Sequence, residues 1–214
     1  VDALCYHAGL KKSERDETQT RFMNGEAPVI VATNAFGMGV DKADVRWVFH
    51  HHASDSLDSY YQEIGRAGRD GQEARAVLFY DARDFGLHRF FAGGGRLEEE
   101  QLCAALQEIL FHPQTTLDEL QEKTEFSRAK LMRVLASLQE MQIVRFAATG
   151  EIERLQEISD LQSLIETLQQ KAEQQRIFEQ SRLQMMQEFA EGRSCRRVFV
   201  LNYFGEEYSA QSCN

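Results

Sequence analysis

The chain has 214 residues, a formal net charge of −10 at pH 7 and an apolar content of 43%. This length suffices for one large domain or several small ones, and the apolar content is enough for a buried core. The acidic balance argues against a protein that coats nucleic acid through its overall charge, and no apolar run reaches the roughly 18 residues that span a bilayer. No signal-peptide pattern opens the chain, which starts inside an apolar run. We therefore expect a fragment of a protein that is cytoplasmic, or nuclear in a eukaryote, and that has no membrane partner.

Residues 1–95 are expected to form an α/β domain, because extended runs alternate with helical ones. The expected strands are 29–33, 45–50 and 76–80, after a first extended run that ends at 7–10, and the expected helices are 12–24 and 57–65. Strands separated by helices predict a parallel sheet covered on both faces. Gly25 is suited to stop the first helix, and the three glycines at 93–95 predict a flexible joint after the domain.

Residues 96–150 are predicted to form a mostly α winged-helix-like domain. Apolar residues recur at helical spacing over 102–110, 117–120 and 131–141, and 143–147 is typical of a strand. Ser127 is a suitable N-cap for the third helix. A short helix, a tight turn, a longer helix and a strand are typical of the winged helix-turn-helix.

Residues 151–214 are predicted to form a helical connector and a further short helical segment. A heptad-like apolar seam begins at Ile158 but breaks at Gln175, which is too soon for a coiled coil. We therefore expect one long helix, or a helix pair, that packs against a neighbouring domain. A last helix is expected over 194–204.

A glycine-bearing loop follows the strand expected at 29–33. Gly37 and Gly39 permit a close approach of the backbone to a ligand. Asp41 offers a carboxylate to a ribose hydroxyl, and Thr33 offers a hydroxyl to the backbone of a nucleic acid. A purely structural glycine turn between two strands would show the same pattern.

Two arginines follow the second predicted helix. Arg66 and Arg69 lie three residues apart, and Gln62 precedes Arg66 by one helical turn. Arginine binds phosphate in a bidentate manner, and an arginine placed against a transferring phosphoryl group accelerates the reaction by about 10³–10⁵-fold in known cases. The alternative is a surface pair that Glu63 and Asp70 neutralise.

The motifs together resemble one known family. Tyr-His-Ala-Gly-Leu at 6–10, Ala-Thr-Asn-Ala-Phe-Gly-Met-Gly-Val-Asp-Lys at 32–42 and Tyr-Tyr-Gln-Glu-Ile-Gly-Arg-Ala-Gly-Arg-Asp-Gly at 60–71 are similar to the lobe entry, motif V and motif VI of the RecQ family of superfamily 2 DNA helicases. Ser-Cys-Arg-Arg at 194–197 and Leu-Asn-Tyr-Phe-Gly-Glu at 201–206 resemble the start of that family's zinc-binding module.

The resemblance implies the second RecA-like lobe of an ATP-dependent DNA helicase that unwinds duplex DNA with 3′–5′ polarity in replication, recombination and repair. Gln62, Arg66 and Arg69 would then line the ATP cleft, with Arg69 as the arginine finger, and Gly39 and Asp41 would lie near the nucleotide.

The remaining positions of the motifs would face DNA in such a protein. These positions are Thr33, Asn34 and His7. The implied partners are single-stranded DNA, duplex junctions, ATP with Mg²⁺, and single-strand-binding and repair proteins.

Several features depart from the family pattern. The phosphate-binding loop G-x-x-x-x-G-K-[ST] and the acidic Mg²⁺ motif do not occur in these residues, because both belong to the first lobe of the family. We therefore expect the fragment to be inactive alone. Ser54 stands where the family has a proline, which is expected to loosen the segment before motif VI. Residues 97–170 resemble an insertion between the lobe and the zinc module.

The cysteines divide into two groups. Cys195 and Cys213 fit the first two ligands of the family's zinc site, but structural zinc needs four ligands. We therefore expect free thiols in this fragment and bound Zn²⁺ in the full-length protein. Cys5 and Cys103 fit no metal spacing and are expected to be buried, and a reducing compartment argues against disulfides.

Two further clusters leave their function open. His50 and His52 would share one face of a strand, as a metal pair or beside a nucleic-acid path. Arg128, Lys130 and Arg133 open the expected recognition helix of the winged-helix segment, where DNA contact is usual. The preceding glutamates at 119, 122 and 125 would repel phosphate, so a structural or protein-binding role fits equally well.

Two rival functions belong to other classes. An RNA-directed superfamily 2 ATPase would share the arginines but not the segment that starts at Cys195. A non-catalytic DNA-binding or adaptor protein would be built on the winged helix, with residues 1–90 as a vestigial lobe.

Overall fold

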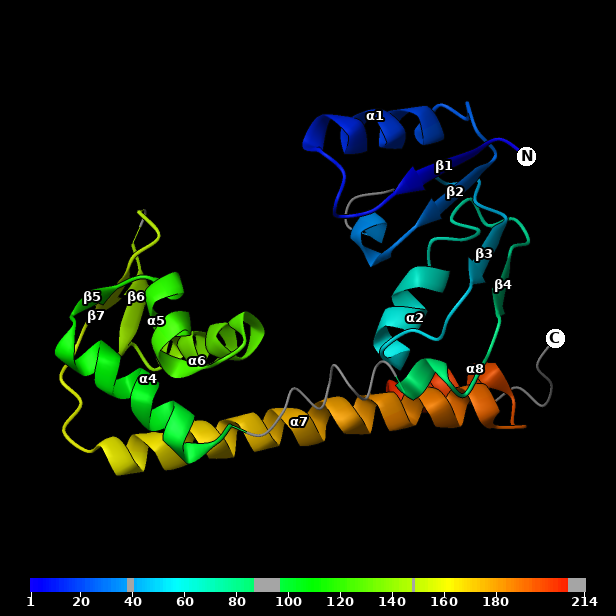
Figure 1. The fold of residues 1–214 in the computed structure, drawn as a ribbon. Helices are drawn as coiled ribbons and strands as arrows, with labels where there is room; N and C mark the ends of the chain where they lie inside the picture. The colour runs from blue at the N-terminus through cyan, green and yellow to red at the C-terminus, as the bar shows by residue number, and fades with distance from the viewer. Residues whose placement is uncertain (38–40, 87–96, 148, 208–214) are drawn as a thin grey trace. The chain divides into compact units, whose positions relative to one another are not determined.

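The computed structural model describes residues 1–37, 41–86, 97–147 and 149–207, in two compact units (Figure 1). One unit contains residues 1–86 and 182–214, and the other contains residues 87–181. This division differs from the three consecutive domains expected from the sequence, because the long helix α7 supplies residues to both units. No described helix has the length and apolar character needed to cross a membrane. The glycines at 93–95, expected to form a joint, lie outside the described residues.

The first unit is built from two parallel strand pairs. Strand β1 (Ala3–Tyr6) pairs with β2 (Val29–Ala32), and β3 (Trp47–His50) pairs with β4 (Arg75–Leu78). Helix α1 (Lys12–Met23) connects β1 to β2 and helix α2 (Leu57–Ile64) connects β3 to β4, as parallel pairing requires. These elements confirm the α/β character of this part of the chain.

The expectation of a sheet covered on both faces is wrong for the described residues. The strands form two separate pairs there. One face of each pair remains open, because Val31 is 62% exposed and Phe49 is 59% exposed, whereas Tyr6 and His50 are buried. Periodicity identifies extended runs, but the pairing of strands is decided by main-chain ladders and packing that it does not encode.

Helix α1 ends as the sequence predicts. Gly25 has a φ of +75°, the left-handed conformation that favours glycine, and its N–H donates to Phe22 O at 3.0 Å. The turn directs Phe22 into a small core beside β1 and β2, where the rings of Tyr6 and Phe36 lie 4.8 Å apart. Phe36 comes from a short 3₁₀ helix, Asn34–Gly37, that follows β2.

The second unit contains the predicted winged helix. Its elements are α4 (Glu99–Phe111), β5 (Gln114–Thr115), α5 (Leu117–Thr124), α6 (Arg128–Glu140), β6 (Val144–Phe146) and β7 (Ile152–Arg154). The strands form an antiparallel sheet in the order β5-β7-β6, and of these only β6 was expected. Ser127 caps α6, since its hydroxyl accepts from Lys130 N at 3.3 Å.

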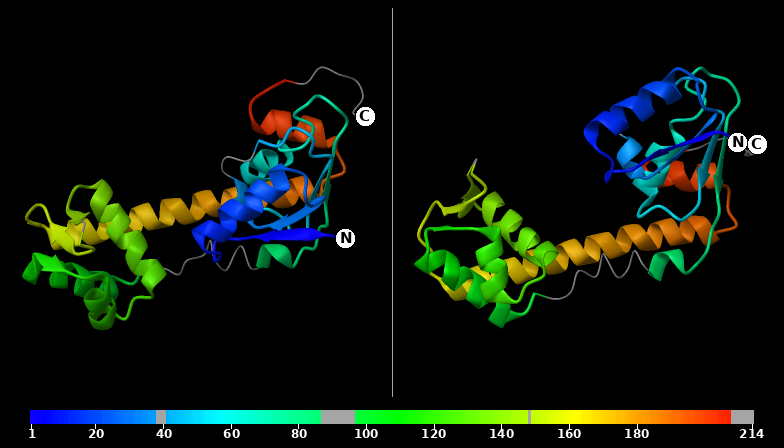
Figure 2. Two further views of the ribbon diagram at one scale, coloured as in Figure 1. Left: turned by 90° about the horizontal axis from the view of Figure 1, so that it is seen from above. Right: turned by 45° about the horizontal axis from the view of Figure 1, so that its top comes forward.

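Helix α7 (Leu161–Glu191) is a single helix of 31 residues, continuous in every view (Figures 1 and 2). Its first half carries the predicted apolar seam, and Ile165 and Leu168 are buried in the core of the winged helix. Its last turns belong to the first unit, where Met186 and Phe189 are buried. Helix α8 (Arg196–Tyr203) follows, with Cys195 as its N-cap.

Candidate nucleotide-binding site

Helix α2 carries the first of the predicted site residues. Ser56 caps the helix by accepting a hydrogen bond from Ser59 N at 3.2 Å. Leu57 and Tyr60 are buried and fix the inner face of α2. Gln62 is consequently exposed on the outer face, where a ligand could reach it.

The turn after α2 depends on one glycine. Gly68 has a φ of +67°, and a Cβ at this position would lie 2.9 Å from Gln72 O and 3.1 Å from the Cβ of Ala74. Its N–H donates to Val45 O at 3.0 Å, which ties the turn to the segment before β3. Only glycine fits this conformation and this space, so the turn determines where the next residue, Arg69, projects.

Arg69 and Asp41 lie in direct contact although 28 residues separate them. Arg69 Nη1 donates to Asp41 Oδ1 at 2.6 Å, and Arg69 Nε donates to Gly65 O at 3.2 Å. The structure thus brings the two predicted nucleotide motifs together. Gly39, the other residue predicted beside the nucleotide, lies outside the described residues.

The second arginine is half-buried beside the first. Burial and then the positive charge of Arg69 lower the pKa of Arg66, and the carboxylate of Glu63 opposes this effect. The carboxylates expected to neutralise a surface pair have other partners, since Asp70 binds Arg46 and Glu63 binds His50. Phosphate charge at this position would relieve the repulsion between the two guanidinium groups.

Glu63 lies in a network that the sequence analysis missed. Its Oε2 accepts from Ser54 Oγ at 2.7 Å and lies 2.8 Å from Nε2 of the buried His50. Ser54 therefore ties the segment before α2 to the helix, and this hydrogen bond opposes the loosening expected from the missing proline. The signal that could have revealed the network is a histidine and a glutamate on elements predicted to be adjacent.

The histidine run does not form the metal pair that was considered. His50 is bound to Glu63, and His51 Nδ1 lies instead 3.0 Å from His52 Nδ1. Across the described ranges, no group of three or more potential ligands could hold a metal. The Nδ1 atom of His50 is buried without a hydrogen-bond partner among those residues.

The three residues predicted to face DNA lie at the carboxyl-terminal end of the first strand pair. Tyr6 and Ala32 are paired at the ends of β1 and β2, so His7 and Thr33, which follow them, leave the sheet side by side. Thr33 N donates to Tyr6 O at 3.1 Å, and Asn34 begins the 3₁₀ helix. All three side chains are exposed and available to a ligand.

The basic residues of the winged helix lie on the first turns of α6, as predicted. Arg128 pairs with Asp118 across 2.8 Å, while Arg133 is exposed and Lys130 is half-buried. Glu119, expected to repel phosphate, turns back to accept from Thr116 N at 2.9 Å. This hydrogen bond, and a further one from the Thr116 hydroxyl, lower the pKa of Glu119.

The cysteines follow the predictions only in part. Cys195 is half-exposed at the start of α8, and its predicted partner Cys213 lies outside the described residues. Cys103 is half-buried against the winged-helix core, but the prediction that Cys5 is buried is wrong, because it is exposed. Residues alternate between the two faces along β1, and Cys5 falls on the face opposite to Leu4 and Tyr6.

Two family models match the chain. The one described as helicase conserved C-terminal domain matches residues 1–71, and the one described as RecQ zinc-binding matches residues 155–214. An ATP-dependent DNA helicase RecQ from Pasteurella multocida is 33% identical over 216 aligned positions, which cover 100% of this chain and 22% of that protein. The chain belongs to the RecQ family.

Other relatives align over shorter stretches. The ATP-dependent DNA helicase RecQ of Bacillus subtilis is 47% identical over 101 residues, which is 47% of this chain and 17% of that protein. The ATP-dependent DNA helicase hus2/rqh1 of Schizosaccharomyces pombe is 57% identical over 84 residues, which is 39% of this chain and 6% of that protein. The chain spans about a fifth of the length of the Pasteurella multocida protein. Residues 72–154, which include most of the winged helix, lie outside both family matches.

Proposed function

We propose that residues 1–86 act as the second ATP-binding lobe of a RecQ-type DNA helicase, in which Gln62, Arg66 and Arg69 contact the nucleotide. The observation that carries this proposal is the contact between Arg69 and Asp41, across 2.6 Å. It joins one predicted nucleotide residue from each of the two motifs.

Arg69 is suited to be the arginine finger, the residue that stabilises negative charge on the transferring phosphoryl group. Its ion pair with Asp41 is solvent-accessible, since the Asp41 side chain is 81% exposed. Such pairs contribute at most about 1 kcal/mol, so a phosphate can replace the carboxylate at small cost. The freed carboxylate of Asp41 can then accept from a ribose hydroxyl.

Arg66 would bind phosphate from a fixed position. Its guanidinium is half-buried close to that of Arg69, and an anion between them is favoured by both charges. ATP bound with Mg²⁺ supplies the phosphoryl group, and this chain contributes the cations that meet it from one side. Contacts from both lobes would couple hydrolysis to lobe closure.

DNA would pass the edge formed by His7, Thr33 and Asn34. Exposed hydroxyl, amide and imidazole groups suit contacts to a sugar-phosphate backbone, which position a strand without reading its sequence. The 3′–5′ polarity belongs to this proposal through the family resemblance alone. The winged helix would add either a second DNA contact or a protein contact, for example to single-strand-binding or repair proteins.

Zinc belongs to the proposal for the full-length protein only. A structural zinc site needs four ligands, and Cys195 with Cys213 supplies two. The described residues offer no cluster that would complete the set. No step of the proposed reaction is therefore assigned to the metal.

The decisive experiment is ATP hydrolysis by the full-length protein with no nucleic acid, with single-stranded DNA and with single-stranded RNA. DNA-stimulated turnover that falls by about 10³-fold or more in Arg69→Ala would support the proposal. Arg75→Ala is the matched control, because Arg75 is also a solvent-accessible arginine in an ion pair, here with the nearby Glu73.

Other outcomes would contradict the proposal. Turnover that responds only to RNA would identify an RNA-directed ATPase, and no turnover in any condition would favour a non-catalytic adaptor. Equal losses in Arg69→Ala and Arg75→Ala would remove the finger role from Arg69. Turnover by the isolated 214-residue chain would refute its expected inactivity.

A further inference from the structure

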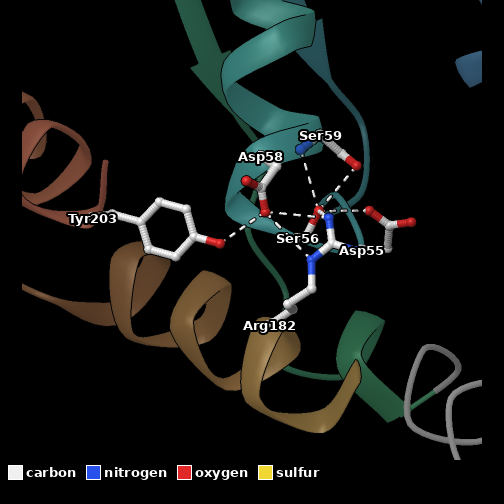
Figure 3. Close-up of polar contacts among 6 residues, drawn as sticks. All are labelled: Asp55, Ser56, Asp58, Ser59, Arg182 and Tyr203. Atoms are coloured by element: carbon white, nitrogen blue, oxygen red, sulfur yellow. Dashed lines mark hydrogen bonds and ion pairs between the residues drawn. The ribbon is translucent and has the colours of Figure 1, made fainter. Parts of the chain in front are cut away.

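The N-cap of α2 also binds another helix. Ser56 is 1% exposed, and its Oγ accepts hydrogen bonds from Ser59 N at 3.2 Å and from Arg182 Nη2 of α7 at 2.9 Å. The same oxygen lies 3.1 Å from Asp55 Oδ1 and 3.0 Å from Ser59 Oγ, and it donates its single hydrogen to one of them. The cap of α2 and an arginine of α7 therefore share one buried oxygen (Figure 3).

Asp58, in the first turn of α2, connects the same arginine to α8. Its Oδ2 accepts from the Tyr203 hydroxyl at 2.8 Å and from Arg182 Nη2 at 3.2 Å. Figure 3 shows the tyrosine and the arginine converging on this carboxylate from two different helices. Burial and then the hydrogen bond to Asp58 raise the pKa of Tyr203, so the phenol remains a donor at neutral pH.

Aromatic contacts hold α2 from the same two helices. The ring of Tyr60 lies 5.0 Å from that of Phe189 on α7, and the ring of Tyr61 lies 4.9 Å from that of Phe204, directly after α8. These contacts are apolar and tolerate small rotations, whereas the hydrogen bonds of Asp58 fix a direction.

Asp58 is also placed to affect the candidate nucleotide residues. It precedes Gln62 by four residues, which is one helical turn, and Arg66 follows after four more in the turn that continues α2. We infer that Arg182, Asp58 and Tyr203 form a latch, through which α7 and α8 set the position of Gln62 and Arg66 toward the phosphates of ATP. The three are positioning residues, and the inference rests on the proposed function.

The latch is suited to orient α2 and adds little to overall stability. Asp58 is 43% exposed and Arg182 is 34% exposed, so solvent screens their attraction. The buried Leu57 and Tyr60 keep α2 attached when the latch is broken. A displacement of about 1 Å at a catalytic group can lower a rate by about 10²-fold, so a loose latch would affect turnover before folding.

The test measures kcat and KM for DNA-stimulated ATP hydrolysis by the full-length protein. The variants are Asp58→Asn, Tyr203→Phe and the double variant. Tyr80→Phe is the matched control, because the Tyr80 hydroxyl also donates to a carboxylate of α7, that of Glu191, but comes from the segment after β4 and not from α2. Hydrogen exchange of the amides at 57–71 provides a second readout that does not depend on turnover.

The expected result is a threefold to tenfold lower kcat in each latch variant, roughly the effect of one lost hydrogen bond, with KM changed by less than about twofold. Exchange at 57–71 should be faster in both latch variants and unchanged in Tyr80→Phe. The double variant should lose no more than about as much as Asp58→Asn alone, because Tyr203→Phe removes one of the two contacts that depend on the Asp58 carboxylate.

Three results would overturn the latch. They are wild-type kinetics and exchange in both latch variants, an equal loss in Tyr80→Phe, and a change confined to KM. A wild-type protein without DNA-stimulated turnover would overturn the proposed function together with the latch. Normal wild-type turnover with unaffected latch variants would overturn the latch alone.

Discussion

His50 Nε2 lies 2.8 Å from Glu63 Oε2, so a buried histidine at the end of β3 is bound to the helix that carries Gln62. The hydroxyl of Ser54 donates to the same carboxylate oxygen at 2.7 Å. The end of β3, the segment before α2 and α2 itself therefore meet at one side chain. The consequences can be measured through pH, as well as through substitution.

Acid stability should depend on Glu63. Burial raises the pKa of Glu63, but the hydrogen bonds from His50 and Ser54 together lower it by more. The pKa of Glu63 therefore lies below the ordinary value of 4.5. A lowered folded pKa stabilises the protein at pH values above 4.5, and this contribution is lost as the pH falls through the folded value. Glu63→Gln should therefore flatten the acid side of the stability profile.

The measurement for Glu63 is the urea midpoint at a series of pH values from neutral to acidic. Glu73→Gln is the control, because Glu73 is 80% exposed and pairs only with the neighbouring Arg75 among the described residues. An identical acid profile for the wild type and Glu63→Gln would show that the network does not stabilise the fold.

Gly68 and Gly71, both in the motif VI turn, distinguish the cost of a positive φ from the cost of a steric clash. Both have a positive φ, but a Cβ at Gly71 would meet no atom within 4 Å, whereas one at Gly68 would meet backbone at 2.9 Å. Gly71→Ala should cost about 1–2 kcal/mol through conformation alone. Gly68→Ala should cost clearly more, because the chain must also move.

Urea unfolding of both glycine variants gives the comparison, and ATP turnover of the full-length protein gives a functional readout. We expect Gly68→Ala to lower turnover more strongly, since Arg69 is the next residue. Equal effects of the two substitutions on unfolding would mean that the close approach at Gly68 is relieved without cost.

Asp41→Asn should separate binding from stability. The pair with Arg69 is solvent-exposed, so the change in the free energy of unfolding should stay below about 1 kcal/mol. If the carboxylate binds the ribose, its loss should raise KM for ATP by about tenfold, the value of a hydrogen bond to a charged group.

The control for Asp41 is Asp44→Asn, which removes a carboxylate 3.0 Å from Lys42 in the same segment. Steady-state kinetics of the full-length protein decide the question. An unchanged KM in Asp41→Asn would exclude a direct contact between this carboxylate and the nucleotide.

If DNA is the partner of the winged helix, its affinity for DNA should fall when α6 loses its basic residues. Lys130→Ala and Arg133→Ala should each reduce the affinity for DNA and lower the dependence of log K on log salt by about 1. Fluorescence anisotropy at several salt concentrations measures both quantities. Lys123→Ala is the control, because Lys123 lies on α5, not on α6, and pairs with Glu108 of α4. Unchanged affinity in both α6 variants would favour a protein-binding or structural role.

Local patterns predicted most elements of the fold. The glycine stop of α1, the serine cap of α6 and the apolar spacing within α6 and α7 act over a few residues, so they can be read along the chain. Strand pairing and strands as short as β5 and β7 depend on distant partners, and the sequence analysis missed them.

The candidate site shows the same division. Gln62, Arg66 and Arg69 belong to one motif, whose residues are close in sequence. The groups that hold α2 in place come from other elements, because His50 contacts Glu63 from β3, and Arg182 and Tyr203 contact Asp58 from α7 and α8. Residue types predict which groups can bind phosphate, but the contacts that hold them in place come from packing across the fold.

The open faces of the strand pairs have a practical consequence for work with the isolated chain. Trp47 and Phe49 are about half exposed, and their rings stack 5.6 Å apart in a surface band. Apolar bands beside unpaired strand edges favour association between molecules. Purified alone, the 214-residue chain should sediment as larger species as its concentration rises. Its binding constants should therefore be measured at protein concentrations low enough to keep it monomeric.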